Sequence, residues 1–375
     1  MTDRHSIPKS GEKHYPCIDA LRFLLASWVA MSHFGVFPLF AGVDASQKLG
    51  WLLSHGWSSM FYGLPAVIVF FVISGFCIHL PFRHFESLSI GKYYARRYTR
   101  ILIPVAGALV ICWLMGQKIQ FWGQHSILWE SVMWSLLCEE IYYLIYPLLL
   151  YLRQRLAWAL IITPTMLLSV GLAATQPKAE GFHDLGPFKT AIILYPVWLL
   201  GCVLAERVDR LPALQSRRRI LVSRLLAWFG CWAVCMLHFH SPIRYTQTCM
   251  WFGVLAYFWV KNEIAYGKVA SSPKWMVWAG AWSYSLYLMH GPALETLRRL
   301  HVPFLGPLMN WVVTMTFVCA YSYIFYFLVE RPSHQFAKRI RVRKSVKPKH
   351  AYVGPVNNFP ESERIVASRK QLTEN

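Results

Sequence analysis

The apolar segment from Cys17 to Phe40 carries two ionisable residues, Arg22 and His33. In an α-helix the eleven steps between them return to the same face, and the two groups lie roughly 16 Å apart along the axis. Ionisable side chains are costly in hydrocarbon and usually line a cavity or a pathway. The pair therefore predicts one membrane helix with a cation near one end and an imidazole near the other. The simpler alternative is an Arg bonded to backbone carbonyls and a His at the headgroup level.

Similar apolar runs recur along the whole chain of 375 residues. Only 15% of the residues are charged, whereas soluble domains carry about 25%. The sequence thus predicts an all-α integral membrane protein with about ten transmembrane helices. We place these spans at 17–38, 61–82, 101–118, 126–151, 157–174, 188–205, 222–239, 246–261, 278–297 and 306–330. The first sixteen residues are polar, so we expect no cleavable signal peptide.

The net charge of +20 is large enough to suggest a nucleic-acid partner, but the positions of the basic residues along the chain argue against one. With the N-terminus placed inside, 30 of the 38 Lys and Arg residues fall in inner segments and 7 in outer loops. This bias predicts that both termini are cytoplasmic. The basic residues then face anionic lipid headgroups, so the expected partner is the lipid bilayer and not a nucleic acid.

The predicted organisation is one membrane domain with two tails. Residues 1–16 form a cytoplasmic N-terminal tail, residues 17–332 the transmembrane domain, and residues 333–375 a basic cytoplasmic tail that we expect to be disordered. The outer loops are short, the longest being about 39–60, so any chemistry must come from the helices and their loops. The nine Cys residues have no paired or zinc-like spacing, and we therefore expect no structural metal.

Ser74 and Gly75 interrupt the bulky run FFVISGFCI. Small residues let helices approach closely, and the other possible role is a thin wall beside a ligand channel. The segment YARRYTRILIP then places Arg97 and Arg100 three residues apart. Guanidinium groups bind phosphate bidentately, which suits a phosphate-bearing ligand. Ordinary anchoring of a cytoplasmic loop by positive charge explains the same two residues.

Two further helix faces carry polar residues. Ser135, Glu139 and Tyr143 follow the spacing i, i+4, i+8, and Glu139 and Glu140 lie near the middle of a span. At least one of these carboxyl groups should pair with a cation or stay protonated. In SYSLYLMHGP, Tyr287 and His290 share a face with Ser283. Glu330 is expected to be a counter-ion for Arg22, Arg97 or Arg100, or an ordinary helix end followed by Pro332.

Depth in the membrane orders these groups. Arg22, Arg97, Arg100 and Glu330 are expected near the cytoplasmic face, and His33, Glu139 and His290 near the middle and outer half. This order suits a phosphate-bearing ligand that enters from inside and delivers a reactive group outward. An imidazole titrates near neutral pH and can act as a general base. A nearby carboxylate would orient the ring, and surrounding donors could stabilise an oxyanion.

Taken together, the motifs resemble the membrane acyltransferase-3 family, which O-acetylates surface sugars. The matching pieces, in family order, are IDALRFLLASWVAMSHF, FFVISGFCI, YARRYTRILIP, WSLLCEEIYYLIYP, YPVWLLGCVLAE, SYSLYLMHGP and the closing Glu330–Pro332. The resemblance implies acetyl-coenzyme A as cytoplasmic acyl donor and a carbohydrate or glycolipid hydroxyl at the outer side as acceptor. It also implies a multi-pass protein of the bacterial cytoplasmic membrane.

The resemblance also implies roles for single residues. Arg22 and His33 match the family's essential pair, Arg97 and Arg100 its coenzyme-serving RxxR motif, and Glu139 its functional Glu. The expected chemistry is deprotonation of the acceptor by His33, supported by Glu139. The hydroxyl then attacks the thioester directly, or an acetyl group first rests on a residue such as Ser74 or a Tyr.

Some family members carry a fused extracytoplasmic hydrolase-like domain, which is not present in this sequence. We therefore expect the chain to act alone or with a separate extracytoplasmic partner. Two alternatives stay open at this point. One is a transporter of an anionic or sugar-linked substrate, which would use the buried charges as a path. The other is a membrane scaffold, which would not need Arg22, His33 and Glu139 at buried depth.

Overall fold

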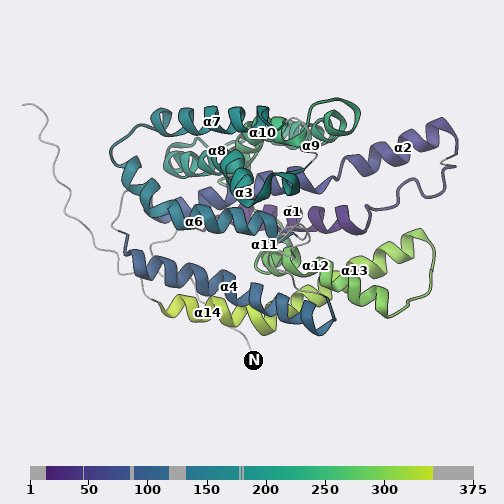
Figure 1. The fold of residues 1–375 in the computed structure, drawn as a ribbon. Helices are drawn as coiled ribbons and strands as arrows, with labels where there is room; N and C mark the ends of the chain where they lie inside the picture. Colours follow the sequence, from purple (N-terminus) through teal and green to yellow (C-terminus); the bar gives the residue numbers. More distant parts are fainter. Residues whose placement is uncertain are drawn as a thin grey trace, which may run out of the picture. The chain divides into compact units, whose positions relative to one another are not determined.

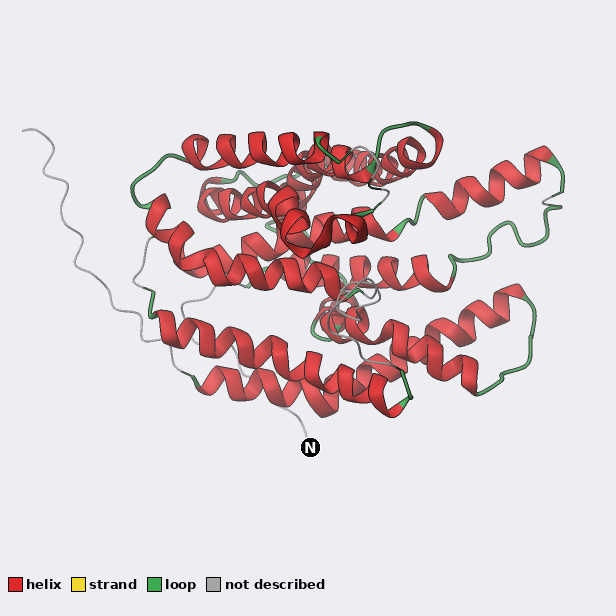
Figure 2. Ribbon diagram, viewed as in Figure 1, coloured by secondary structure: helices red, strands yellow, loops and turns green. Residues whose placement is uncertain are grey.

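The structure, a computed structural model, has an all-α fold in its described residues, as predicted. These residues are 14–44, 46–84, 88–117, 132–176, 179 and 181–340. Within these ranges every regular element is a helix (Figure 2). The predicted cytoplasmic tail 333–375 lies mostly outside the described residues. Residues 126–131 of the fourth predicted span also lie outside them.

The helices follow the predicted spans closely in most of the chain (Figure 1). In order they are α1 (Pro16–Phe34), α2 (Lys48–Ser59), α3 (Gly63–His79), α4 (Ile90–Leu114), α6 (Met133–Arg153), α7 (Trp158–Ala174), α8 (Gly186–Arg207), α9 (Arg217–His240), α10 (Tyr245–Tyr266), α11 (Lys274–Gly280), α12 (Ser283–Arg299), α13 (Pro307–Phe325) and α14 (Arg331–Arg339). Proline begins α1 and α13, where its missing N–H costs no helical hydrogen bond.

Seven helical segments of the described chain are long and apolar enough to cross a membrane. They are Pro16–Phe34, Lys48–Phe82, Ile90–Leu114, Met133–Arg153, Gly186–Arg210, Arg217–His240 and Pro307–Arg339. α7 is apolar but has only 17 residues. The chain is therefore a multi-pass membrane protein. The full number of ten spans and the cytoplasmic side of the termini stay predictions.

The structure corrects three boundaries of the predicted spans. The expected loop 39–60 contains helix α2. The span expected at 278–297 is broken at Ala281–Trp282 into α11 and α12, where the Ser283 hydroxyl donates to the Gly280 carbonyl (2.8 Å). The last span does not end at Glu330, because a π-helical turn at Tyr326–Glu330 leads directly into α14.

The tightest helix contact in the described chain joins α3 to α8, and glycine makes it possible. A Cβ atom built on Gly75 would lie 2.0 Å from the Trp198 carbonyl oxygen, and one built on Gly201 would lie 2.0 Å from the Val72 carbonyl oxygen. The expected close approach at Ser74–Gly75 is thus confirmed. It brings the Ser74 side chain close to α6 and α8.

α1 is surrounded by α3, α11 and α12, which cover most of its length. Gly280 of α11 presses on the backbone of α1, since a Cβ there would lie 2.3 Å from the Asp19 carbonyl oxygen. α1 is capped at its C-terminal end by Gly35, whose φ of 106° is readily adopted by glycine but strained for other residues. The helix therefore stops one residue after His33.

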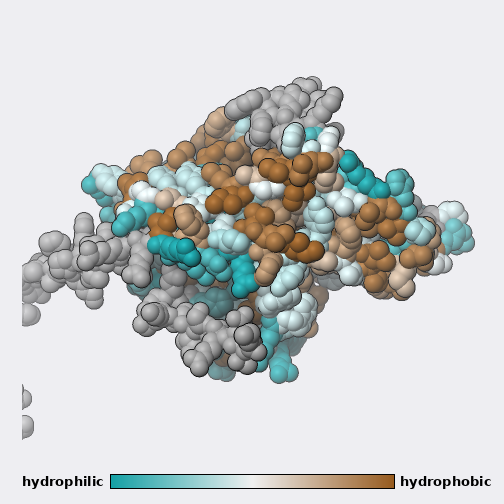
Figure 3. All heavy atoms as spheres, turned by 90° about the horizontal axis from the view of Figure 1, so that it is seen from below, coloured by the Kyte–Doolittle hydropathy of each residue, from teal (hydrophilic) through white to brown (hydrophobic). Residues whose placement is uncertain are grey.

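Many large apolar side chains stay exposed on the outside of the helices, among them Trp113, Leu167, Phe188 and Trp251. Figure 3 shows broad apolar areas on one face of the molecule. A soluble protein rarely exposes so many large apolar side chains close together, so this surface fits a lipid environment.

Candidate functional site

The two ionisable residues of α1 lie in different surroundings. Arg22 stands in the second turn and is half-buried, and His33 stands in the last turn. They share one helix face and are separated by roughly 16 Å along the helix axis. The site therefore has two ends, which are described in turn.

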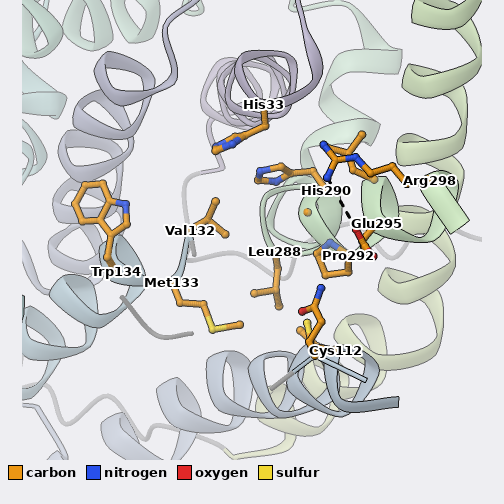
Figure 4. Close-up of a pocket in the computed structure, with 14 residues that line it drawn as sticks. His33, Cys112, Val132, Met133, Trp134, Leu288, His290, Pro292, Glu295 and Arg298 are labelled. Carbon is orange, nitrogen blue, oxygen red and sulfur yellow. Dashed lines mark ion pairs between the residues drawn. The ribbon is translucent and has the colours of Figure 1, made fainter. Parts of the chain in front are cut away.

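At the first end, His33 meets His290 of α12. The two imidazole rings lie 5.0 Å apart between their centroids, at an angle of 38° (Figure 4). His290 is 1% exposed, and its Nδ1 lies 3.3 Å from the Leu286 carbonyl oxygen. The predicted His residues from the first and ninth spans thus form one pair.

The histidine pair borders a cavity of about 410 Å³. Its walls come from α1, α4, α6 and α12, and it is drawn in Figure 4. The lining residues are His33, Ala108, Cys112, Gln117, Val132, Met133, Trp134, Leu288, His290, Gly291, Pro292, Leu294, Glu295 and Arg298. Such a volume lies in the range of small-molecule sites, roughly 300–1,000 Å³.

Next to the histidine pair, Ser135 and Tyr287 are hydrogen bonded at 2.7 Å between their hydroxyl oxygens. The Tyr287 ring stands edge-on to His290, with the centroids 6.2 Å apart. The Tyr287 hydroxyl also donates to the Val132 carbonyl oxygen. These contacts fix one side of the His290 ring, and they join two of the predicted polar faces.

Glu139 belongs to a separate hydrogen-bonded group. The Tyr143 hydroxyl donates to Glu139 Oε2 at 2.6 Å and lies 2.9 Å from the Ser74 hydroxyl. The Trp198 indole N–H donates to the Ser74 oxygen at 3.2 Å. No hydrogen bond joins Glu139 to His33 among the described residues, so the expected direct support of His33 by Glu139 is not seen.

The other end of the site is a cluster of guanidinium groups, which we call the arginine cluster: Arg22, Arg97 and Arg100. The Arg97 guanidinium lies over the Tyr143 ring, 5.2 Å from its centroid. Arg100 is close enough to Arg22 and Arg97 to be repelled by both. None of the three makes a hydrogen bond or an ion pair with another described residue. The cluster is therefore a place where an anion would be stabilised.

Glu330 is the buried carboxylate next to this cluster. It is 1% exposed and accepts hydrogen bonds from the Ser285 N–H (3.1 Å) and the Ser285 hydroxyl (2.5 Å). It attracts Arg22 and Arg100 over a longer distance, without direct contact. The structure thus supports a counter-ion for Arg22 and Arg100, and the alternative of an ordinary helix end is wrong because the helix continues.

A sequence profile of an acyltransferase domain matches residues 15–329. The chain belongs to the acyltransferase 3 family. The match spans both ends of the site, from α1 to Val329, directly before Glu330. The matched segment is therefore an acyltransferase domain by family.

The curated relatives that match this acyltransferase 3 chain are distant. The O-acetyltransferase OatA of Staphylococcus aureus strain NCTC 8325 is 24% identical over 354 residues. A protein of S. aureus strain COL, named "Putative O-acetyltransferase", is 22% identical over 347 residues. Each alignment covers 79% of this chain and 57% of the relative, so the chain spans little more than half the length of these proteins. No solved structure matches.

Glu140 is one of the two carboxyl groups predicted to pair with a cation or stay protonated. Both of its carboxylate oxygens are buried without a hydrogen-bond partner among the described residues, and it attracts Arg97. The sequence patterns do not indicate three other residues of this acyltransferase site. Ser285 holds Glu330, and His334 lies 3.5 Å from the same carboxylate. The predicted span 278–297 ends before Arg298, but α12 includes this residue, and its side chain lines the cavity. Its spacing of i+3 from Glu295 was the available signal.

Among the described residues, no group of three His, Cys, Asp or Glu side chains could hold a metal ion. All nine Cys residues lie in this part of the chain and are free. The polar groups of the site are therefore imidazoles, guanidinium groups, carboxylates and hydroxyls.

Proposed function

We propose that this acyltransferase moves an acetyl group from acetyl-coenzyme A, bound from the cytoplasm, to a carbohydrate hydroxyl at the outer side of the membrane. The observation that carries the proposal is the placement of two unlike sites on α1. Arg22 belongs to an arginine cluster that forms no ion pair with another described residue, and His33 lies at a cavity at the other end of the helix. The relatives named as O-acetyltransferases support oxygen as the acceptor atom.

The arginine cluster fits the donor. Coenzyme A carries phosphate groups, and guanidinium groups bind phosphate through paired, charge-assisted hydrogen bonds. Arg22 and Arg97 both repel Arg100, and no carboxylate of the described residues hydrogen bonds to the three. Binding of a polyphosphate would relieve this repulsion. We therefore assign the three residues to the donor.

His33 is the proposed general base. The bound donor supplies an acetyl group activated as a thioester. The His33 imidazole takes the proton of the acceptor hydroxyl, whose oxygen bonds to the acetyl carbon as the carbon–sulfur bond breaks. The imidazolium then returns the proton to the thiolate that leaves. General acid–base catalysis of this kind contributes about 10²- to 10⁴-fold in rate.

Glu139 is proposed to act through the donor end of the site. It attracts both Arg22 and Arg97, and Tyr143 connects it to the Arg97 guanidinium through a hydrogen bond and a ring contact. A carboxylate fixed in this way orients the guanidinium groups before the donor binds. Glu139 is thus a positioning residue in this proposal, and Ser74 helps to hold it through Tyr143.

The proposal includes a topology. We place the tails 1–16 and 333–375 in the cytoplasm, around a transmembrane domain of residues 17–332 in the bacterial cytoplasmic membrane. The charge bias of the sequence supports this orientation. The acceptor is a carbohydrate or a glycolipid, and a separate extracytoplasmic partner could receive or present it.

The test uses membranes from cells that express the chain, incubated with acetyl-labelled coenzyme A and total surface glycan. Label should move to the glycan with the native chain and be lost with His33→Ala at matched protein level. His240→Ala is the matched control, because His240 is exposed at the end of α9, away from the cavity. The proposal is wrong if the native chain neither transfers label nor binds coenzyme A.

A further inference from the structure

The cavity beside the histidine pair has a polar side that the proposed chemistry does not use. Gln117, Glu295 and Arg298 line it together with His33 and His290 (Figure 4). Arg298 lies two helical turns beyond His290 on α12, about 12 Å along the axis. A ligand with a hydroxyl at His33 thus meets a guanidinium group further along the same wall.

The positive charge of Arg298 is only weakly neutralised within the described chain. The Arg299 Nε–H donates to Glu295 Oε1 at 3.0 Å, which makes a hydrogen-bonded ion pair. Arg298 approaches the same carboxylate only to 3.9 Å, and its side chain is 75% exposed. One carboxylate therefore faces two guanidinium groups, and Arg298 is the more weakly paired of them. Arg299 does not line the cavity but lies closer to Glu295, so the positive charge of Arg298 at the cavity is only weakly neutralised.

The rest of the cavity suits a ring with an apolar face. Leu288, Pro292 and Met133 line it, together with the Trp134 indole. Trp134 is 6% exposed and stacks on Phe182, with the ring centroids 5.3 Å apart, so the indole is held in place. Mostly apolar walls with a few directed polar groups are typical of pockets that select a small polar ligand.

We propose that this cavity takes an anionic sugar, with Arg298 binding its carboxylate or phosphate group while a sugar hydroxyl lies at His33. The inference rests on the proposed function and names its acceptor class. Arg298 is a specificity-determining residue in this proposal and has no part in the acyl transfer itself. An Arg that only anchored α12 to lipid headgroups would not distinguish an acidic sugar from a neutral one.

The experiment measures binding of three soluble trisaccharides to the purified full chain, followed by Trp fluorescence. The probes are a hexuronic acid trisaccharide, the same compound after reduction of its carboxyl groups to neutral hexose, and this neutral compound carrying one phosphate. A hydrogen bond to a charged group contributes about 1.5–3 kcal/mol. We therefore expect the acidic probes to bind about tenfold or more tightly than the neutral probe.

Arg298→Gln should remove this preference, while binding of the neutral probe changes little. Lys189→Gln is the matched control, because it removes an exposed positive charge that does not line the cavity. It should leave the preference intact. Comparison of the two acidic probes shows whether a carboxylate or a phosphate is preferred.

The inference is overturned if the three probes bind equally, if none binds, or if both variants lose the preference alike. Coenzyme A binding is measured on the same preparations to separate this result from the proposed function. If the chain binds coenzyme A but does not prefer the acidic probes, only the proposed acceptor class is rejected. If the native chain prefers the acidic probes, loses this preference in Arg298→Gln and binds no coenzyme A, the anionic-sugar site stands and the transfer reaction is rejected.

Discussion

The imidazole rings of His33 and His290 lie 5.0 Å apart although 256 residues separate them in the chain. His290 is almost fully buried, and Tyr287 and the Leu286 carbonyl hold its ring. His33 is the ring of this pair that is more open to the cavity. This geometry suits one ring that exchanges protons with the acceptor and a second ring that fixes its position.

His290→Gln should therefore lower acyl transfer by about tenfold or more without weakening coenzyme A binding. The reason is that Gln keeps a polar side chain but cannot replace the ring that packs on His33. The measurement is label transfer to glycan at saturating donor, compared with His33→Gln, which should lose about 10²-fold or more. Equal activity of His290→Gln and the native chain would show that the ring contact has no role in transfer.

Arg97→Gln should weaken donor binding. The substitution removes a guanidinium group from the arginine cluster but keeps a polar, uncharged side chain. A lost charge-assisted contact predicts roughly ten- to hundredfold weaker binding of coenzyme A, measured by calorimetry on the purified chain. Lys92→Gln is the control, because Lys92 lies on the same helix but is exposed. If both variants lose the same affinity, the effect is one of overall charge.

Tyr143→Phe should separate the hydrogen bond to Glu139 from the ring contact to Arg97. Phe keeps the ring under the guanidinium group and removes the hydroxyl that donates to Glu139 and contacts Ser74. We expect transfer to fall by about tenfold or more. Tyr142→Phe removes an equally buried hydroxyl that donates to the Ala191 carbonyl instead, and it should keep most of the activity. A reversed order of the two variants would contradict the role given to Glu139.

Gly75→Ala should destabilise the fold, because the new methyl group would meet the Trp198 carbonyl oxygen at 2.0 Å. Overpacking of this kind costs about 1–3 kcal/mol or more. The measurement is the unfolding temperature of the detergent-solubilised chain. Gly171→Ala is the control, since nothing lies within 4 Å of its added methyl group within α7 and Ala is the better helix former. Equal unfolding temperatures would mean that α3 and α8 can move apart at little cost.

Helix periodicity explains why part of the site could be predicted from the sequence. The shared face of Arg22 and His33, and the i, i+4 relation of Glu139 and Tyr143, depend only on the local geometry of one helix. The Tyr143–Glu139 hydrogen bond confirms the second relation directly. Gly75 was likewise predictable as a point of close approach, since its lack of a side chain is a property of the residue alone.

The partners of these residues could not be predicted in the same way. Nothing in the spacing of α1 indicates that His33 meets His290. Nothing in the spacing of α6 indicates that Tyr143 bonds to Ser74 of α3. Gly280, directly before the break at Ala281–Trp282, packs against Asp19, which lies far away in the chain. Arg298 lies just beyond the predicted span 278–297, and only the structure shows that α12 includes it.

The sequence by itself therefore determined the membrane class of the protein, most of its helices and the two unlike ends of α1, because apolar run length and helical period are local properties. The tertiary structure alone decided which side chains meet: the histidine pair, the hydrogen bonds that hold Glu139, the counter-ion role of Glu330 and the place of Arg298 at the cavity. These contacts join helices that are distant in the chain. They are set by how helix surfaces pack, with glycine permitting the closest approaches.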